Sequence, residues 1–320
     1  MALGTNHIIL GEVPNFIPEL WSDEVIAAYK SNLVMAQLVR KLNHRGKKGD
    51  TIKIPTPTRG SASDKSTSAQ AQVTLIQHGA DTGLSISINK HKHYARLIED
   101  IVDIQALESL RRFYTDDGGY AIARQVDTDL LIEAFNTGSA SLVYDATNNE
   151  LTTASTFDTI YEGDGTVWDE TTATDISDAG IRTQVKLLDD VDAPMAGRYA
   201  VIPTIAKFDL LGTARFTEQA FVGEVGQGNS IRNGIVGDAY GIEFYVTTRL
   251  PLVEDSSANA DNASGVFFQR DAIVLVEQLG VRSQSQYKLE YLADLFVTDM
   301  IYGVKVLRDD SVNTFVVPTT

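Results

Sequence analysis

The chain has 320 residues, and 43% of them are hydrophobic, which suffices for a buried core and excludes a wholly disordered protein. Its 43 acidic residues outnumber the 27 basic ones, and the net charge of −16 disfavours a protein that grips nucleic acid. The absence of cysteine excludes disulfides, catalytic thiolates and thiolate metal ligands.

The N-terminal residues carry neither the charged start nor the apolar run of a signal peptide, and no stretch is apolar enough for a membrane helix. We therefore expect synthesis and folding in a cytoplasm. Pro14 and Pro18 favour extended backbone. Ser22 is a candidate cap for a short amphipathic helix that runs to about Leu33, and Trp21 is its expected anchor.

A cluster of basic residues comes next. Its members are Arg40, Lys41, Arg45, Lys47, Lys48, Lys53 and Arg59. Nucleic-acid contact is one interpretation, but single-stranded nucleic acid is normally held with interleaved aromatic residues, and this cluster has none. We therefore favour a surface that faces solvent or a partner protein.

Two segments with alternating apolar and polar residues predict a long hairpin. Ile52 and Ile54 would share one face of the first strand, and Leu84, Ile86 and Ile88 one face of the second. The intervening stretch RGSASDKSTSAQAQ is small and polar. Because a hairpin of this kind cannot bury itself, we expect it to project from the body and to need a partner.

Residues 99–136 carry apolar residues at helical spacing and predict one long helix. Gly118 and Gly119 each cost about 1 kcal/mol relative to alanine, so two helices that meet there are the alternative. Residues 137–176 are rich in small polar residues and predict an insertion with short strands.

The rest of the chain alternates helix and strand before it ends in strands. Ser177 or Asp178 caps a predicted helix that ends near Val191. Residues 198–212 predict a buried strand followed by a helix, and the stretch from Gly265 to Asp310 predicts strands.

The glycines near residue 230 do not complete a phosphate-binding loop. Gly226 and Gly228 fit the start of a dinucleotide-binding pattern, but Ile231 stands where the third glycine is required. After Gly241 comes a strand pattern, IEFYV, rather than a helix. We interpret these glycines as turns.

Other catalytic and metal-binding patterns are equally weak. His91 and His93 would lie on one side of a strand, but a third metal ligand is not evident. Asp164, Asp169 and Glu170 lack the spacing of a calcium loop, and no nucleophile elbow is present. We therefore assign no catalytic, cofactor-binding or metal-binding residue.

The order of the predicted elements resembles the major capsid protein of tailed double-stranded DNA bacteriophages with the Hong Kong 97 (HK-97) fold. It is similar to the podovirus and cyanophage types. The segments that carry the resemblance are 16–39, 48–58, 121–131, 233–251 and 302–310.

The resemblance implies an α+β, HK-97-like fold. Its implied parts are an N-terminal arm (1–45), an E-loop (46–98), a peripheral domain with a spine helix and sheet (99–137 and 266–320), an insertion (138–177) and an axial domain (178–265).

The resemblance also implies a structural role without catalysis or cofactor. Pentamers and hexamers of the chain would build an icosahedral shell around the phage DNA, without sequence-specific binding, in a virion assembled in the bacterial cytoplasm. A portal and a scaffolding protein are the implied partners, and a decoration protein is left open. We expect the scaffolding protein to be separate, because no long N-terminal extension precedes the arm. Some members crosslink a lysine to a neighbour's asparagine, and no matching motif is found here.

We expect contacts between subunits on the arm and the hairpin. The candidates are Trp21, Arg40, Lys47, Lys48, Arg59, Asp64 and Lys65. The alternatives are an encapsulin-like nanocompartment shell of the same fold, a soluble α+β hydrolase, and a tail or decoration protein.

Overall fold

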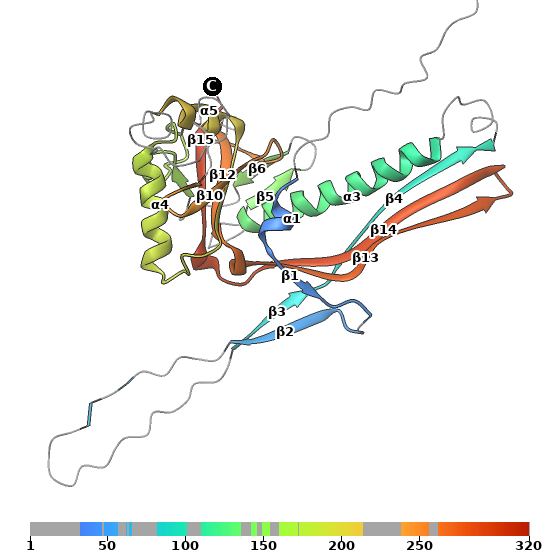
Figure 1. Ribbon diagram of the computed structural model, residues 1–320, viewed down its shortest axis with the longest axis horizontal. Helices are drawn as coiled ribbons and strands as arrows, with labels where there is room; N and C mark the ends of the chain where they lie inside the picture. The colour runs from blue at the N-terminus through green and yellow to red at the C-terminus, as the bar shows by residue number, and fades with distance from the viewer. Residues whose placement is uncertain are drawn as a thin grey trace, which may run out of the picture.

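Two sheets organise the chain in the computed structural model (Figure 1). The structure describes residues 33–46, 48–56, 62, 64–65, 82–100, 110–135, 142–145, 149–153, 160–171, 173–213, 238–255 and 262–319. A nine-stranded sheet and two helices form one end, which we call the lobe. A four-stranded sheet extends from the lobe as a long, flat blade, and a two-stranded hairpin projects from the base of the blade. No helix in the described part of the chain is long and apolar enough to cross a membrane.

The blade sheet joins strands from distant parts of the sequence. Its strands, in spatial order, are β1 (Arg40–Asn43), β13 (Ile273–Lys288), β14 (Ala293–Val306) and β4 (Lys90–Glu99). The β1 strand pairs with β13 in parallel and only as far as Glu277, whereas β14 is antiparallel to both β13 and β4. The far half of the blade is therefore three strands wide.

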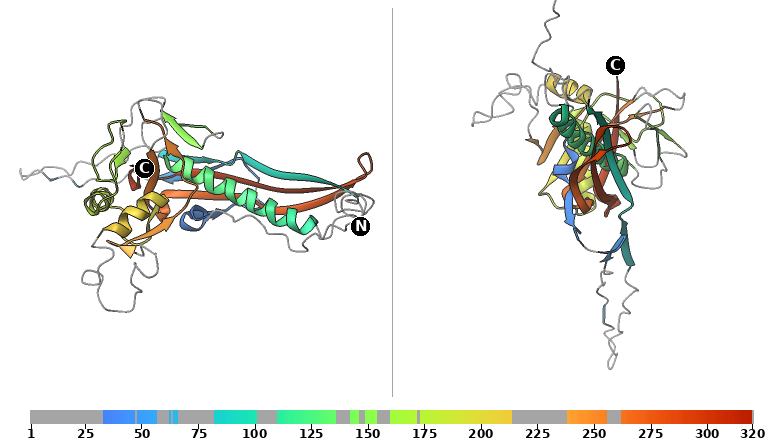
Figure 2. Two further views of the ribbon diagram at one scale, coloured as in Figure 1. Left: turned by 90° about the horizontal axis from the view of Figure 1, so that it is seen from above. Right: turned by 90° about the vertical axis from the view of Figure 1, so that its right-hand side faces the viewer.

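The helix α3 (Leu110–Phe135) lies along one face of the blade (Figure 2). It is continuous through both glycines, so the single long helix is confirmed from Leu110 onward, while residues 101–109 lie outside the described part of the chain. A Cβ atom on Gly118 would lie 2.9 Å from Cδ1 of Tyr94. The bare backbone at Gly118 thus lets the helix approach the sheet closely.

Polar groups fasten α3 to the blade. The hydroxyl of Tyr302 donates to Asp129 at 2.5 Å, and Nζ of Lys90 lies 3.3 Å from the same carboxylate. Burial is the main cause that raises the pKa of Tyr302. The hydroxyl of Tyr94 donates to Asp117 at 2.8 Å. Buried polar groups paired in this way fix the position of the helix along the sheet.

The centre of the lobe sheet contains both antiparallel and parallel pairs of strands. Its strands are β5 (Leu142–Asp145), β6 (Glu150–Thr153), β7 (Ile160–Glu162), β8 (Arg198–Ile202), β9 (Asp238–Ala239), β10 (Ile242–Val246), β11 (Leu252–Val253), β12 (Asn262–Gln269) and β15 (Val312–Pro318). The β12 strand is antiparallel to β8 and β15, and β10 is parallel to β8. The short strands predicted between residues 137 and 176 all join this sheet.

Two helices cover the lobe sheet, and the sequence pattern predicts both. The helix α4 (Asp178–Asp190) is capped by Ser177, whose hydroxyl accepts a hydrogen bond from the Gly180 amide at 3.1 Å. A Cβ atom on Gly180 would lie 2.0 Å from the carbonyl oxygen of Gly163, so only glycine fits there. The helix α5 (Thr204–Gly212) follows β8 directly, as expected.

The glycine of the IEFYV segment is a turn residue. Tyr240 and Gly241 have φ of 53° and 76° and connect β9 to β10, whose Ile242 pairs with Ala239. Two consecutive residues with positive φ are typical of a two-residue hairpin turn. The turn interpretation is confirmed for Gly241, while the glycines from 226 to 237 lie outside the described residues.

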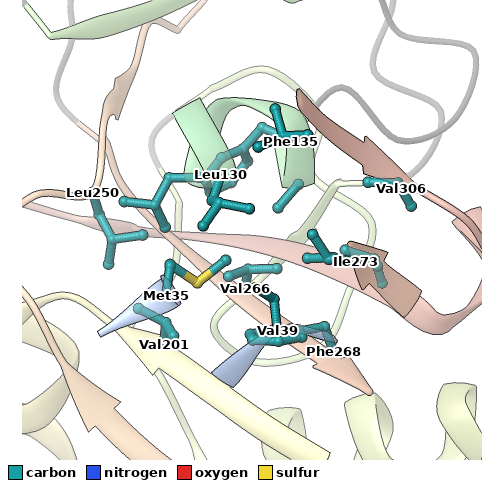
Figure 3. Close-up of a cluster of buried hydrophobic side chains, with 14 of the residues drawn as sticks. Met35, Val39, Leu130, Phe135, Val201, Leu250, Val266, Phe268, Ile273 and Val306 are labelled. Atoms are coloured by element: carbon teal, nitrogen blue, oxygen red, sulfur yellow. The ribbon is translucent and has the colours of Figure 1, made fainter. Parts of the chain in front are cut away.

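One hydrophobic core joins the lobe to the blade (Figure 3). Met35 from α1 (Met35–Leu38), Leu130 from α3, Val266 from β12 and Ile273 from β13 are all completely buried in it. Asp127 adds a polar tie, because its Oδ1 accepts hydrogen bonds from the amides of Met35 (2.7 Å) and Ala36 (3.4 Å). Full burial of each large apolar side chain contributes about 1.5–3 kcal/mol, so the lobe and the blade base form one unit.

The hairpin consists of β2 (Thr51–Thr56) and β3 (Thr82–Ser87). Ile52 pairs with Ile86 and Ile54 with Leu84, which confirms the predicted antiparallel hairpin and its apolar face. Its root packs on the blade face opposite α3, where Ile86 and Ile88 meet Val274 and Val276. Two short 3₁₀ helices complete the fold. The first, η3 (Arg270–Ala272), follows β12, and the second, η4 (Asp309–Ser311), precedes β15.

Candidate inter-subunit surfaces

The acidic and histidine clusters singled out in the sequence have structural roles. Asp164 and Asp169 each accept hydrogen bonds from the residue two positions on, Thr166 (2.8 Å to the amide) and Thr171 (3.1 Å to the amide). These bonds hold the pKa of both aspartates below the ordinary value. Within the described residues, no three His, Cys, Asp or Glu side chains lie close enough to hold a metal ion.

His91 belongs to an ionic cluster that braces the blade. Its Nε2 lies 3.1 Å from Oδ2 of Asp299, and Arg282 donates to both oxygens of that carboxylate at 2.7 and 2.9 Å. Asp299 is the backbone partner of His93 on β4, so the cluster links all three strands. The hydrogen bond from Arg282, and after it the one from His91, keeps the pKa of Asp299 below its usual range.

Four of the seven predicted contact residues lie in the described part of the chain. Arg40 is exposed on β1, with Nη1 3.8 Å from Oδ1 of Asp271, and Lys48 is exposed just before β2. Asp64 and Lys65 are both exposed. Trp21, Lys47 and Arg59 lie outside the described residues. The structure thus places Arg40 and Lys48 near the base of the blade.

The basic cluster is only partly paired with acidic residues in the described part of the chain. Arg45 pairs with Glu277 at 2.6 Å. Lys41, Lys48 and Lys53 are exposed and form no ion pair within the part of the chain that the structure describes. We call these three lysines the basic surface. An acidic partner is the natural complement of such a surface.

The end of the blade carries a second surface, which the sequence pattern did not indicate. The turn between β13 and β14 exposes Leu289 (78%), Tyr291 (64%) and Leu292 (63%). It lies at the end of the blade farthest from the lobe (Figures 1 and 2). We call residues 287–292 the blade tip. The sequence pattern predicts continuous strands here, because this turn contains no glycine, proline, asparagine or aspartate.

The lobe exposes apolar side chains of its own. Phe208 on α5 is 72% exposed, and Met195 in the loop after α4 is 77% exposed. Beside Phe208, burial and then the charge of Asp175 raise the pKa of Asp209. The blade tip and the lobe therefore each present apolar side chains that the described part of the chain leaves uncovered.

The fold defined by these parts is that of HK-97-like phage capsid proteins. The structure is similar to a protein of Mycobacterium phage Che8, with a TM-score of 0.69, 23% identity, and coverage of 94% of this chain and 97% of that chain. It is also similar to the capsid of cyanophage P-SCSP1u, with a TM-score of 0.70, 18% identity, and coverage of 99% and 97%. The capsid of Ralstonia phage GP4 is similar as well, with a TM-score of 0.67, 15% identity, and coverage of 99% of both chains.

The sequence itself matches a family. A model of the family described as phage capsid protein matches residues 86–312, which is more than half of the chain, so the chain belongs to that family. It is a structural major capsid protein that forms an icosahedral shell, and not an enzyme. No curated protein matches the chain. The α+β, HK-97-like fold and the capsid role implied by the resemblance are thereby confirmed.

Proposed function

We propose that copies of this chain close into pentamers and hexamers, and that these rings tile the shell around double-stranded phage DNA. The observation that carries this proposal is the projection of the blade and the hairpin from the lobe, with exposed surfaces at each (Figure 1). A contact between two different patches of neighbouring copies repeats around a ring when the rotation closes.

The proposed role of each segment follows from the parts of the HK-97-like fold that the resemblance implies. Residues 1–45 serve as the N-terminal arm, and residues 46–98 as the E-loop that reaches over a neighbour. The β4 strand at the end of that loop pairs with β14, which anchors the loop to the peripheral sheet. Residues 99–137 and 266–320 form the peripheral domain, and 178–265 the axial domain at the ring centre. Residues 138–177 are an insertion.

The proposed contacts between neighbours use opposite charges. The basic surface, with Arg40, Lys47, Arg59 and Lys65, would meet acidic patches on adjacent copies, and Trp21 and Asp64 are further candidate contacts. The 43 acidic residues of the chain are the source of those proposed patches. Buried or partly desolvated charge pairs of this kind fix register and orientation more than they add affinity.

The proposed cargo is double-stranded DNA, which the shell encloses without binding it tightly. Because the chain is acidic, its charge opposes tight adhesion to a polyanion pumped into the shell. The proposed partners are further copies of the chain, a separate scaffolding protein and a portal, and a decoration protein is left open. Assembly would take place in the cytoplasm of the bacterial host.

The test is an assembly experiment with charge-reversed chains. The chain is expressed alone and with candidate neighbouring open reading frames, and its products are followed by sedimentation and negative-stain electron microscopy. We expect rings or closed shells from the natural chain, and loss of them when Lys47 and Lys48 are both changed to Glu. The same two positions changed to Arg keep the charge and serve as the matched control.

Two outcomes would contradict the proposal. A chain that stays monomeric under every condition would remove the ring-forming role. Normal particle yield from the double Glu variant would show that these two lysines contribute nothing to contacts between subunits.

A further inference from the structure

A groove on the lobe combines apolar walls with two carboxylates. It has a volume of about 670 Å³ and is lined by residues of α5, which Figure 1 shows at the top of the lobe, and by residues that precede α4. Ile176 and Leu211 supply apolar surface, and the side chain of Phe208 is 72% exposed. Asp175 and Asp209 line the same groove. The groove therefore offers an aromatic face, aliphatic surface and negative charge in one place.

The two carboxylates of the groove lack a counter-ion. Within the described residues, neither Asp175 nor Asp209 forms an ion pair, and Oδ2 of Asp209 is buried without a hydrogen-bond partner. Burial, and after it the charge of Asp175, raises the pKa of Asp209. Both causes act against the charged form of this carboxylate, so a bound cation would remove an existing energetic cost.

An organic cation suits the groove better than a metal ion does. Within the described part of the chain, no third carboxylate or histidine completes a metal site, and Ca²⁺ takes about six to eight oxygen ligands. An ammonium group on an aliphatic chain can instead meet the two carboxylates with its head and pack its stem against Phe208 and Leu211. The face of the phenylalanine ring also attracts a cation.

We propose that this groove binds an organic cation, namely a primary ammonium group carried on an aliphatic chain. Asp175 and Asp209 hold the ammonium group, and Phe208 and Leu211 contact the aliphatic stem. Two sources have this chemistry, a free aliphatic amine and a lysine side chain of a second copy. The inference goes beyond the proposed assembly, because the groove is formed by residues of one copy.

Titration of the unassembled full-length chain tests the groove directly. The probe is butane-1,4-diamine, and binding is followed by isothermal titration calorimetry at fixed ionic strength. We expect saturable binding to one site with a dissociation constant of roughly 1 mM, which suits so small a ligand in an open groove.

Variants of the groove locate the bound amine. Asp175→Asn and Asp209→Asn should each weaken binding roughly fivefold, because each removes one charge and keeps the shape of the side chain. Phe208→Leu keeps an apolar side chain but loses the aromatic face, and should weaken binding roughly threefold. Asp190→Asn is the matched control, because it removes an exposed carboxylate of α4 that does not line the groove. Far-ultraviolet circular dichroism checks that each variant folds.

The same titration on closed shells identifies the source of the cation. If free amines fill the groove, shells bind the probe as the unassembled chain does. If a lysine of a neighbouring copy fills it, shells no longer bind the probe, and Asp209→Asn lowers the yield of shells. Either result supports the inference. A chain that forms no shells would refute the proposed assembly and leave the titration of the unassembled chain valid.

Two results would overturn the inference. An unassembled chain without saturable binding of the diamine would show that the groove does not take an ammonium group. Equal affinities of the natural chain and all three groove variants would show that only the overall negative charge of the chain attracts the diamine.

Discussion

Two adjacent glycines in α3 differ in whether the packing around them requires a glycine. Gly118 faces the blade, and a Cβ atom there would lie 2.9 Å from the ring of Tyr94 and 3.4 Å from Oγ1 of Thr298. Gly119 has no heavy atom within 4 Å of its Cβ position. From the sequence alone the two glycines look like one weak point in a helix. In the structure, only Gly118 is required for packing.

Alanine substitutions at these two glycines should change the free energy of unfolding in opposite directions. Gly119→Ala should raise the free energy of unfolding by about 0.5–1 kcal/mol, because alanine loses less backbone entropy in a helix. Gly118→Ala should lower it by about 1–2 kcal/mol, since the tyrosine ring must move from a packed position. Urea unfolding of the unassembled chain, followed by circular dichroism, measures both. A Gly118→Ala chain more stable than the natural one would contradict this account of the packing.

At the scale of elements, the hairpin root depends on a close crossing of two strands. A Cβ atom on Gly303 of β14 would lie 2.5 Å from the carbonyl oxygen of Ser87 in β3. The obstacle is backbone, which cannot rotate away as a side chain can. A residue with any side chain at this position would therefore push β3 off the blade.

Gly303→Ala should accordingly loosen the hairpin root. We expect faster hydrogen exchange of the β3 amides, and a loss of about 1–3 kcal/mol in the free energy of unfolding from overpacking. Gly83→Ala is the matched control, because its Cβ would lie 3.9 Å from the nearest atom, the carbonyl oxygen of Ile54. Equal exchange rates in the two variants would show that the crossing tolerates a side chain.

Local patterns predict most elements but not how they pair. The alternation around Ile52 and Ile86 predicts both hairpin strands, and the capping signal at Ser177 predicts the start of α4. Strand order is out of reach, because β1 pairs with a strand that begins at Ile273 and nothing local encodes that partner. The blade tip escapes prediction for a related reason, since its turn is held by contacts to Asp100, far away in the sequence, instead of by turn-forming residues.

The whole molecule is extended, and its dimensions can be measured. A compact chain of this length has a radius of gyration of about 20 Å. Because the blade and the hairpin both project from the lobe (Figure 1), we expect small-angle X-ray scattering of the unassembled chain to give a clearly larger value. The measurement needs conditions in which the chain sediments as a monomer. A value near that of a compact chain would mean that the projections fold back in solution.

The strand order also decides when the molecule can fold. In the blade, β1 and β4 pair only with β13 and β14, and in the lobe β8 and β7 pair with β12 and β15. All four of these partners come from residues 262–318. Neither sheet can therefore close until the last part of the chain has left the ribosome. Because translation adds only about 5–20 residues per second, the earlier strands wait for many seconds without their partners. Pairings so distant in sequence also form slowly. A nascent chain therefore offers no finished surface to its neighbours, and assembly begins only with completed subunits.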